Sequence, residues 1–185
     1  MSWQIDPVHT HIEFSIRHLM ITNVRGQFDK FNGTVEFDEQ NPAQTKVDLQ
    51  IEAASINTKA ADRDNHLRSA DFLDVAVYPT LTFKSKNVVL TDRTHARLTG
   101  DLTIHGVAKE VVMEVEYVGS QKTPWGGLSA GFNARTKINR KDWGLVWNVG
   151  LETGGVLVGD ELTVTIEVEL IKVQEQAAAA AGASA

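Results

Sequence analysis

Cysteine is absent from this chain of 185 residues. A chain without cysteine has no disulfide, no thiol nucleophile and no thiolate ligand for a metal ion. Lysine and arginine form no basic run, and the formal net charge is −6, which argues against a nucleic-acid partner. No apolar run approaches the length of about 20 residues that a helix needs to cross a bilayer. These absences indicate an acidic, soluble, globular protein.

Signatures of nucleotide binding and of nucleophilic catalysis are also scarce. The sequence contains no P-loop and no G-x-G-x-x-G turn between a strand and a helix. Cysteine, an intrinsically strong nucleophile, is missing as well. We therefore expect a protein that is not an enzyme and that holds no cofactor.

The first residues give an expectation for the compartment. The sequence opens on Trp3-Gln4-Ile5-Asp6-Pro7. A secretory signal would show a basic region followed by an apolar one, and neither is present here. We expect a cytoplasmic protein, whereas a signal removed before this sequence would place the protein in the periplasm.

Size and composition are those of one ordinary globular domain. Hydrophobic residues make up 42% of the chain and charged residues 23%, and a chain of this length buries one large core. We expect residues 1–173 to form a single domain. Residues 174–185 are rich in alanine and have no apolar face to bury, so we expect them to be disordered.

Apolar and polar residues alternate along most of the chain. Val164, Ile166, Val168 and Leu170, for example, alternate with threonines and glutamates. A two-residue period predicts strands with one buried and one solvated face, which is typical of antiparallel sheets. The same pattern predicts further strands near residues 12–18, 24–28, 34–38, 46–51, 80–89, 96–104, 111–117 and 128–135. His105-Gly106 is interpreted as a tight turn between two of them, with His105 at positive φ.

About eight antiparallel strands allow either a sandwich or a closed barrel. Closure would remove the exposed edges that long strands otherwise present. The inward positions mix large residues such as Phe83 with small ones such as Gly100 and Ala134. Small inward residues leave internal volume, and a barrel of this size can hold one slender ligand.

Residues 59–73 interrupt the alternation. This segment is charged, rich in alanine and free of β-branched residues, so it predicts a helix. It carries Asp62, Arg63, Asp64, His66 and Arg68, which could bind an anion or perform acid–base chemistry. The alternative is a solvated helix face with pairs such as Asp64 and Arg68.

Two further groups have both a functional and a structural interpretation. His9, His11 and Glu13 would share one face of a strand and could bind a metal, but they could equally form a solvated polar row. No second ligand cluster accompanies them, and we expect no metal. Trp143 and Trp147 would share a face of an extended segment, either as an apolar wall of a ligand site or as plain core.

The chain resembles the bacterial YceI-like polyisoprenoid-binding proteins. The resemblance covers nearly all of residues 2–173 and is carried, in order, by Trp3-Gln4-Ile5-Asp6-Pro7-Val8-His9-Thr10, Phe14-Ser15-Ile16-Arg17-His18, Val24-Arg25-Gly26 with Phe28, Arg63-Asp64-Asn65-His66-Leu67-Arg68-Ser69-Ala70-Asp71-Phe72, Tyr78-Pro79 with Phe83, Gly100-Asp101-Leu102-Thr103-Ile104-His105-Gly106-Val107, Asn139-Arg140-Lys141-Asp142-Trp143-Gly144 and Val158-Gly159-Asp160-Glu161.

This resemblance implies a mainly β fold, a closed antiparallel eight-stranded lipocalin-like barrel with one short helical segment near residues 59–73. Members of that family hold polyisoprenoid chains, and sometimes other long amphiphiles, in an apolar interior. We expect a non-catalytic carrier of a prenyl pyrophosphate or an isoprenoid quinone. The residues expected to contact the tail are Phe14, Ile16, Phe28, Leu49, Phe72, Phe83, Leu102, Phe132, Trp143, Trp147 and Ile166. Those expected at the head group are Arg17, His18, Arg63, His66 and Arg68.

Three alternatives stay open at this point. The chain could be an enzyme acting on a small amphiphile, with His66 and Asp64 as an acid–base pair. It could instead be a solidly packed barrel whose helix binds a protein. The sequence does not fix the oligomeric state, and a homodimer is compatible with it.

Overall fold

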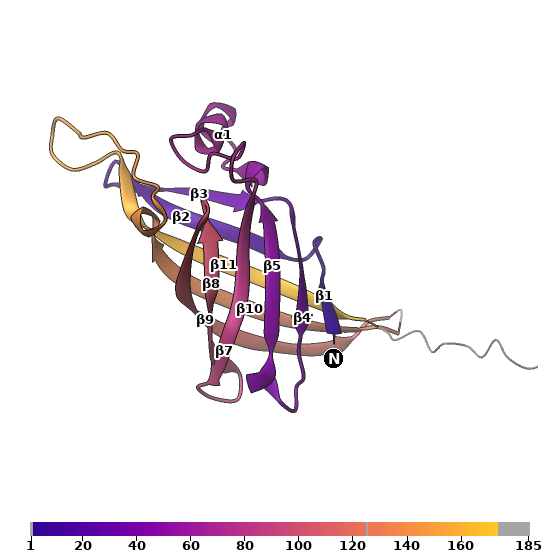
Figure 1. Ribbon diagram of the computed structural model, residues 1–185. Helices are drawn as coiled ribbons and strands as arrows, with labels where there is room; N and C mark the ends of the chain where they lie inside the picture. The colour runs from indigo at the N-terminus through magenta and orange to yellow at the C-terminus, as the bar shows by residue number, and fades with distance from the viewer. Residues whose placement is uncertain (1, 125, 174–185) are drawn as a thin grey trace, which may run out of the picture.

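The computed structural model describes residues 2–124 and 126–173; the expected disordered tail, residues 174–185, lies outside them. Within this part of the chain, eight long antiparallel strands follow one another around a barrel (Figure 1). Three of them are interrupted and form two segments each: β1 (Ser2–Ile5) with β2 (His11–His18), β3 (Thr22–Phe28) with β4 (Phe31–Glu36), and β5 (Lys46–Glu52) with β6 (Ile56–Asn57). The other five are β7 (Thr80–Leu90), β8 (His95–Ile104), β9 (Val107–Lys122), β10 (Leu128–Asn139) and β11 (Val158–Lys172).

The last strand closes the barrel. One edge of β11 pairs with β10, and the other edge pairs with β2 along most of its length and with β1 at its end. Trp3 thereby lies opposite Lys172, and Ile12 lies opposite Ile166. The prediction of an antiparallel barrel is confirmed, and the sandwich is excluded because the pairing runs around the ring without a break.

The predicted inward faces are the buried ones. Ile12, Leu49, Phe83 and Leu102 belong to one apolar core cluster, as their positions in the alternation require. The turn between β8 and β9 is also as predicted, because His105 has φ 51° and Gly106 has φ 73°. Two central residues at positive φ match the twist of a hairpin.

The helix is shorter than the segment predicted for it. α1 (Ala61–Arg68) begins after Lys59, whose φ is 61°, and ends where the Ser69 hydroxyl donates to the His66 carbonyl. Residues 69–78 continue as turns. Serine favours such local bonds to the backbone over a helical continuation. Short 3₁₀ helices occur at η1 (Pro42–Gln44), η2 (Ala53–Ser55) and η3 (Arg140–Trp143). Among the described residues no helix is both long and apolar enough to span a membrane.

Candidate functional site: a two-chambered cavity in the barrel

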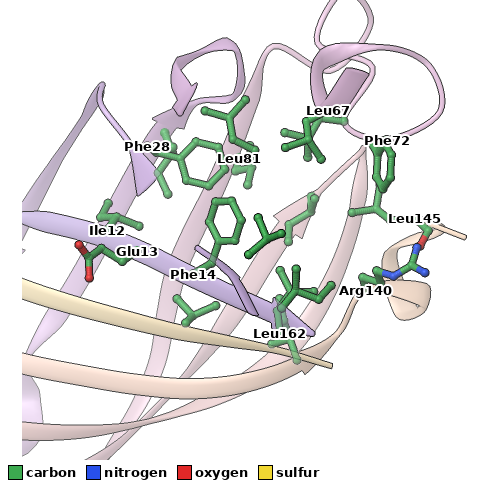
Figure 2. Close-up of a pocket in the computed structure, with 18 of the residues that line it drawn as sticks. Ile12, Glu13, Phe14, Phe28, Leu67, Phe72, Leu81, Arg140, Leu145 and Leu162 are labelled. Atoms are coloured by element: carbon green, nitrogen blue, oxygen red, sulfur yellow. The ribbon is translucent and has the colours of Figure 1, made fainter. Parts of the chain in front are cut away.

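The barrel is not filled by its own side chains. Its main cavity has a volume of about 490 Å³ and lies at the end of the barrel that α1 covers. Figure 2 shows Phe14, Phe28, Leu67, Leu81 and Phe72 gathered around this space from strands and from the helical segment. The structure brings together here most of the predicted tail-contacting residues, namely Phe14, Ile16, Phe28, Leu49, Phe72, Phe83, Leu102, Trp147 and Ile166.

A second cavity of about 220 Å³ occupies the opposite end of the barrel. Phe132 lines this second cavity and not the first. Ala96 and Ala134 line it too, as expected for small inward residues that leave volume. Five residues border both cavities and form a ring that we call the waist: Ile12, Leu49, Phe83, Met113 and Ile166.

The packing of Phe83 at the waist depends on a glycine. The ring of Phe83, only 2% exposed, lies against Gly100 on the neighbouring strand. A methyl group added at Gly100 would stand 2.5 Å from Cζ of Phe83, much closer than carbon atoms pack. The small size of Gly100 had suggested free volume in the interior. The Phe83 ring occupies the space beside Gly100 instead.

Trp143 lies outside both cavities. Residues 140–143 form the 3₁₀ helix η3, so Trp143 and Trp147 do not share an extended face. The Trp143 side chain is 2% exposed, and its Nε1 donates to the Leu102 carbonyl at 3.0 Å. Trp147 alone reaches the main cavity, where its ring meets those of His66 and Phe72 at centroid distances of 4.7 and 5.2 Å.

Four of the five predicted head-group residues border the main cavity: Arg17, His18, Arg63 and His66. Arg17 is exposed at the end of β2, and among the described residues its guanidinium makes one hydrogen bond, a long one of 3.5 Å from Nη1 to Oδ1 of Asn23. Nε2 of His66 lies 2.8 Å from Asp71. The apolar interior thus opens beside a group of polar side chains, as a site for an amphiphile requires.

The remaining charged residues of the helical segment hold α1 in place. Asp64 is buried and accepts hydrogen bonds from the backbone and hydroxyl of Thr58 at 2.9 and 2.5 Å. Arg63 donates to the hydroxyl and carbonyl of the same threonine. Arg68 donates to the carbonyls of Ala54 and Ile56 at 2.8 and 2.9 Å and borders neither cavity.

These contacts change two of the sequence interpretations. Arg68 is engaged with backbone carbonyls, so the pair with Asp64 expected on a solvated helix face does not form. The histidine of the proposed acid–base pair contacts Asp71 and not Asp64, because Asp64 is bound to Thr58. The particular pair named in the enzyme alternative, His66 with Asp64, therefore does not form.

Arg140 is a cavity-lining residue that the sequence reasoning missed. It is 3% exposed, and it donates to the carbonyls of Gly159, Leu145 and Trp147 at 2.8, 2.6 and 2.9 Å. Burial lowers the pKa of its guanidinium, and the Asp160 carboxylate partly opposes that shift. Figure 2 shows Arg140 beside Leu145 at the edge of the cavity. Its neighbours Lys141 and Asp142 are exposed, but Arg140 continues the inward alternation of Thr136 and Ile138 on β10, which is the signal that could have found it.

Two other features of the sequence do not form the sites that their patterns suggest. His9 precedes β2, and its Nδ1 lies 2.7 Å from Asp6 and 3.8 Å from Glu169, so it does not share a strand face with His11 and Glu13. Residues 127–131 match the G-x-S-x-G pattern of hydrolases, but Ser129 lies within β10 and not at a strand-to-helix turn. Among the described residues its buried hydroxyl oxygen has no hydrogen-bond partner, hence no base to activate it.

Comparison with known proteins shows which family the chain belongs to. A YceI-like domain matches residues 3–170. The chain belongs to the YceI-like family. This YceI-like chain is 45% identical to the protein named YceI of Escherichia coli O157:H7 over 142 residues. The aligned stretch covers 77% of this chain and 74% of that protein. The resemblance found in the sequence is confirmed.

Solved structures of similar fold agree. The YceI protein of Campylobacter jejuni is 34% identical, with a TM-score of 0.74 over 85% of this chain and 90% of that one. A polyisoprenoid-binding domain from Saccharophagus degradans, implicated in plant cell wall breakdown, is 16% identical, with a TM-score of 0.66 over 91% of this chain and 97% of that one. The YceI-like barrel is thus common to chains with little sequence in common.

Proposed function

We propose that this protein binds and carries a long isoprenoid lipid, a prenyl pyrophosphate or an isoprenoid quinone, with its tail inside the barrel. The observation that carries the proposal is the pair of adjoining apolar cavities along the barrel, the larger of which is bordered by Arg17, His18, Arg63 and His66. A long, slender, apolar ligand with a polar head group fits this arrangement.

The tail supplies the affinity. Removing each CH₂ from water contributes about 0.8 kcal/mol before the costs of binding. Ligands of substantial size retain only about 0.3 kcal/mol per heavy atom. A tail of about forty carbons would then reach on the order of 12 kcal/mol, which corresponds to nanomolar affinity as an upper bound.

The head group supplies the orientation. Arg17 offers a guanidinium that is exposed and weakly engaged, so it can donate charge-assisted hydrogen bonds to a pyrophosphate. His18 and His66 border the same part of the cavity and can donate to a quinone oxygen or an anion. Arg63 is already bound to Thr58, which leaves it less free for a ligand than Arg17.

The comparisons support the same class of ligand. The neighbour from Saccharophagus degradans is described as a polyisoprenoid-binding domain, and it shares the barrel. The family match extends over the strands that line both cavities. A packed barrel that acts only through its surface would not leave two apolar cavities of this size.

Native mass spectrometry of the purified protein, followed by denaturing extraction, is the decisive experiment. We expect a stoichiometric adduct whose extracted mass is that of a prenyl lipid. Protein that carries no adduct and also fails to bind added prenyl pyrophosphates and quinones would contradict the proposal. An extracted straight-chain lipid would support the part of the proposal that concerns lipid carriage and contradict the part that names an isoprenoid.

A further inference from the structure

Two loops beside the main cavity expose apolar side chains to solvent. At the turn between β2 and β3, Leu19, Met20 and Ile21 are 37%, 54% and 78% exposed. In the loop between η3 and β11, Val146 and Val149 are 62% and 46% exposed. We call these five residues the rim.

The turn after β2 and the loop before β11 lie against each other. The backbone N–H of Leu19 donates to the Leu157 carbonyl at 2.9 Å, and Met20 packs against Gly155. Figure 1 shows the turn after β2 beside the loop that leads into β11, at the end of the barrel where α1 lies. His18, which precedes Leu19, and Leu157, which is hydrogen-bonded to Leu19, border the main cavity. The rim therefore lies directly beside the cavity.

The turn residues are not those that the turn geometry selects. Leu19 and Met20 have φ of 51° and 64°, and the N–H of Ile21 donates to the His18 carbonyl. Two central residues at positive φ favour asparagine and glycine, and a leucine there is strained. The turn between β8 and β9 follows the rule with His105-Gly106. Local structure thus does not account for Leu19 and Met20, and an outlier of this kind points to a function for the side chains.

We propose that the rim inserts into the surface of a lipid bilayer and so places the cavity mouth against the membrane. The inference rests on the proposed function, since an isoprenoid ligand would dissolve in a bilayer. The rim consists of five side chains on two loops, whereas a stable protein interface uses roughly 20–30 residues a side. A small apolar rim next to the main cavity fits a deformable acyl layer better than it fits a second copy of the chain.

Flotation with vesicles of phosphatidylcholine tests the inference on ligand-free protein. We expect the wild-type chain to float with the vesicles, and the double variant Leu19→Asn, Met20→Gly to lose at least about tenfold in partitioning. The variant places favourable residues in the turn, so it should unfold no more readily than wild type. The matched control is Val118→Asn, which removes an apolar side chain, 64% exposed, from the middle of β9.

The outcomes separate the possibilities. No flotation of wild type overturns the inference, and so does equal flotation of the double variant. Self-association of wild type that the double variant abolishes, without flotation, would assign the rim to a second copy and also overturn it. Loading of prenyl lipid from detergent, measured on the same proteins, should be equal in both. If neither loads, the proposed carrier function fails while the flotation result stands on its own.

Discussion

Arginine serves two different purposes in this barrel. Arg17 is exposed at the cavity mouth and makes one long hydrogen bond, to Asn23, among the described residues. Arg140 is buried and donates hydrogen bonds to three backbone carbonyls and to Asp160. A guanidinium can do the second because it presents five donors in a plane, while an ammonium presents three at one point. The fixed Arg140 orients the loop that carries Leu145 and Trp147 into the cavity.

At the mouth we predict that Arg17→Gln weakens a prenyl pyrophosphate by about 10- to 100-fold, since a hydrogen bond to a charged group contributes about 1.5–3 kcal/mol. The matching uncharged prenol should bind as it does to wild type. Arg25→Gln is the matched control, because Arg25 is exposed on the paired strand but borders neither cavity. Titration of both ligands by intrinsic tryptophan fluorescence measures the difference, and equal losses for both would remove Arg17 from the site.

For Arg140 we predict that Arg140→Lys lowers the free energy of unfolding by about 2 kcal/mol, because one ammonium cannot reach all the carbonyls. Arg140→Ala should cost more, about 3–5 kcal/mol, as it leaves a buried group of carbonyls unpaired. Urea denaturation gives both values. Lys141→Ala, an exposed neighbour, should change stability by less than about 0.5 kcal/mol. A stable Arg140→Lys protein would show that the loop is held by other contacts.

At the scale of elements, the sequence was most informative where one local rule decides the structure. The two-residue alternation predicted which faces of the strands point inward, and His105-Gly106 predicted a turn with positive φ, both now confirmed. The end of α1 was missed because it depends on the Ser69 hydroxyl, which bonds to the His66 carbonyl. The placement of Arg68 was missed because its partners, the carbonyls of Ala54 and Ile56, lie in another element, and such bonds form only once the two segments have packed together.

At the far end of the barrel a side-chain hydrogen bond links β9 to the segment before η1. The Tyr117 hydroxyl on β9 donates to Glu39, which precedes η1, at 2.6 Å, and both border the second cavity. Hydrogen bonds from Ser120 and Tyr117 hold the pKa of Glu39 below its ordinary value of 4.5. Since the folded state favours the ionised carboxylate, this contribution to stability is complete above pH 4.5 and is lost as pH falls through the lower pKa of the folded protein.

We therefore predict that Tyr117→Phe makes the stability of the protein less dependent on pH in the acidic range. The melting temperature of wild type should fall more steeply than that of the variant as pH drops below 4.5. The comparison uses thermal melts of the two proteins between neutral and acidic pH. Parallel curves would show that Glu39 is ionised equally well without the tyrosine.

At the scale of the whole molecule, the waist divides the interior into a larger chamber near the mouth and a smaller one beyond it. A short tail can be satisfied by the first, and only a long one has to pass Phe83 to enter the second. The position of a residue relative to the waist should therefore decide which ligands it affects.

We predict that Phe132→Arg weakens long prenyl tails by at least about tenfold and leaves short ones unchanged, because a charge in the second cavity opposes only tails that reach it. Retained binding of short tails also shows that the variant is folded. Asn133→Arg is the control, an exposed neighbour on the same strand. Competition between prenols of increasing length measures the preference. An unchanged preference for length in the variant would mean that tails stop at the waist.

The seam between β1 and β11 has a consequence for how the chain reaches this state. Trp3 meets Lys172, so the ring is joined by residues from opposite ends of the barrel sequence. During synthesis β1 must wait until β11 has emerged from the ribosome, and pairings between such distant segments form slowly. Until then β10 on one side, and β1 with β2 on the other, present unpaired edges, and the apolar lining faces water. The nascent barrel is thus most open to chaperones, and to aggregation, in the interval before its last strand arrives.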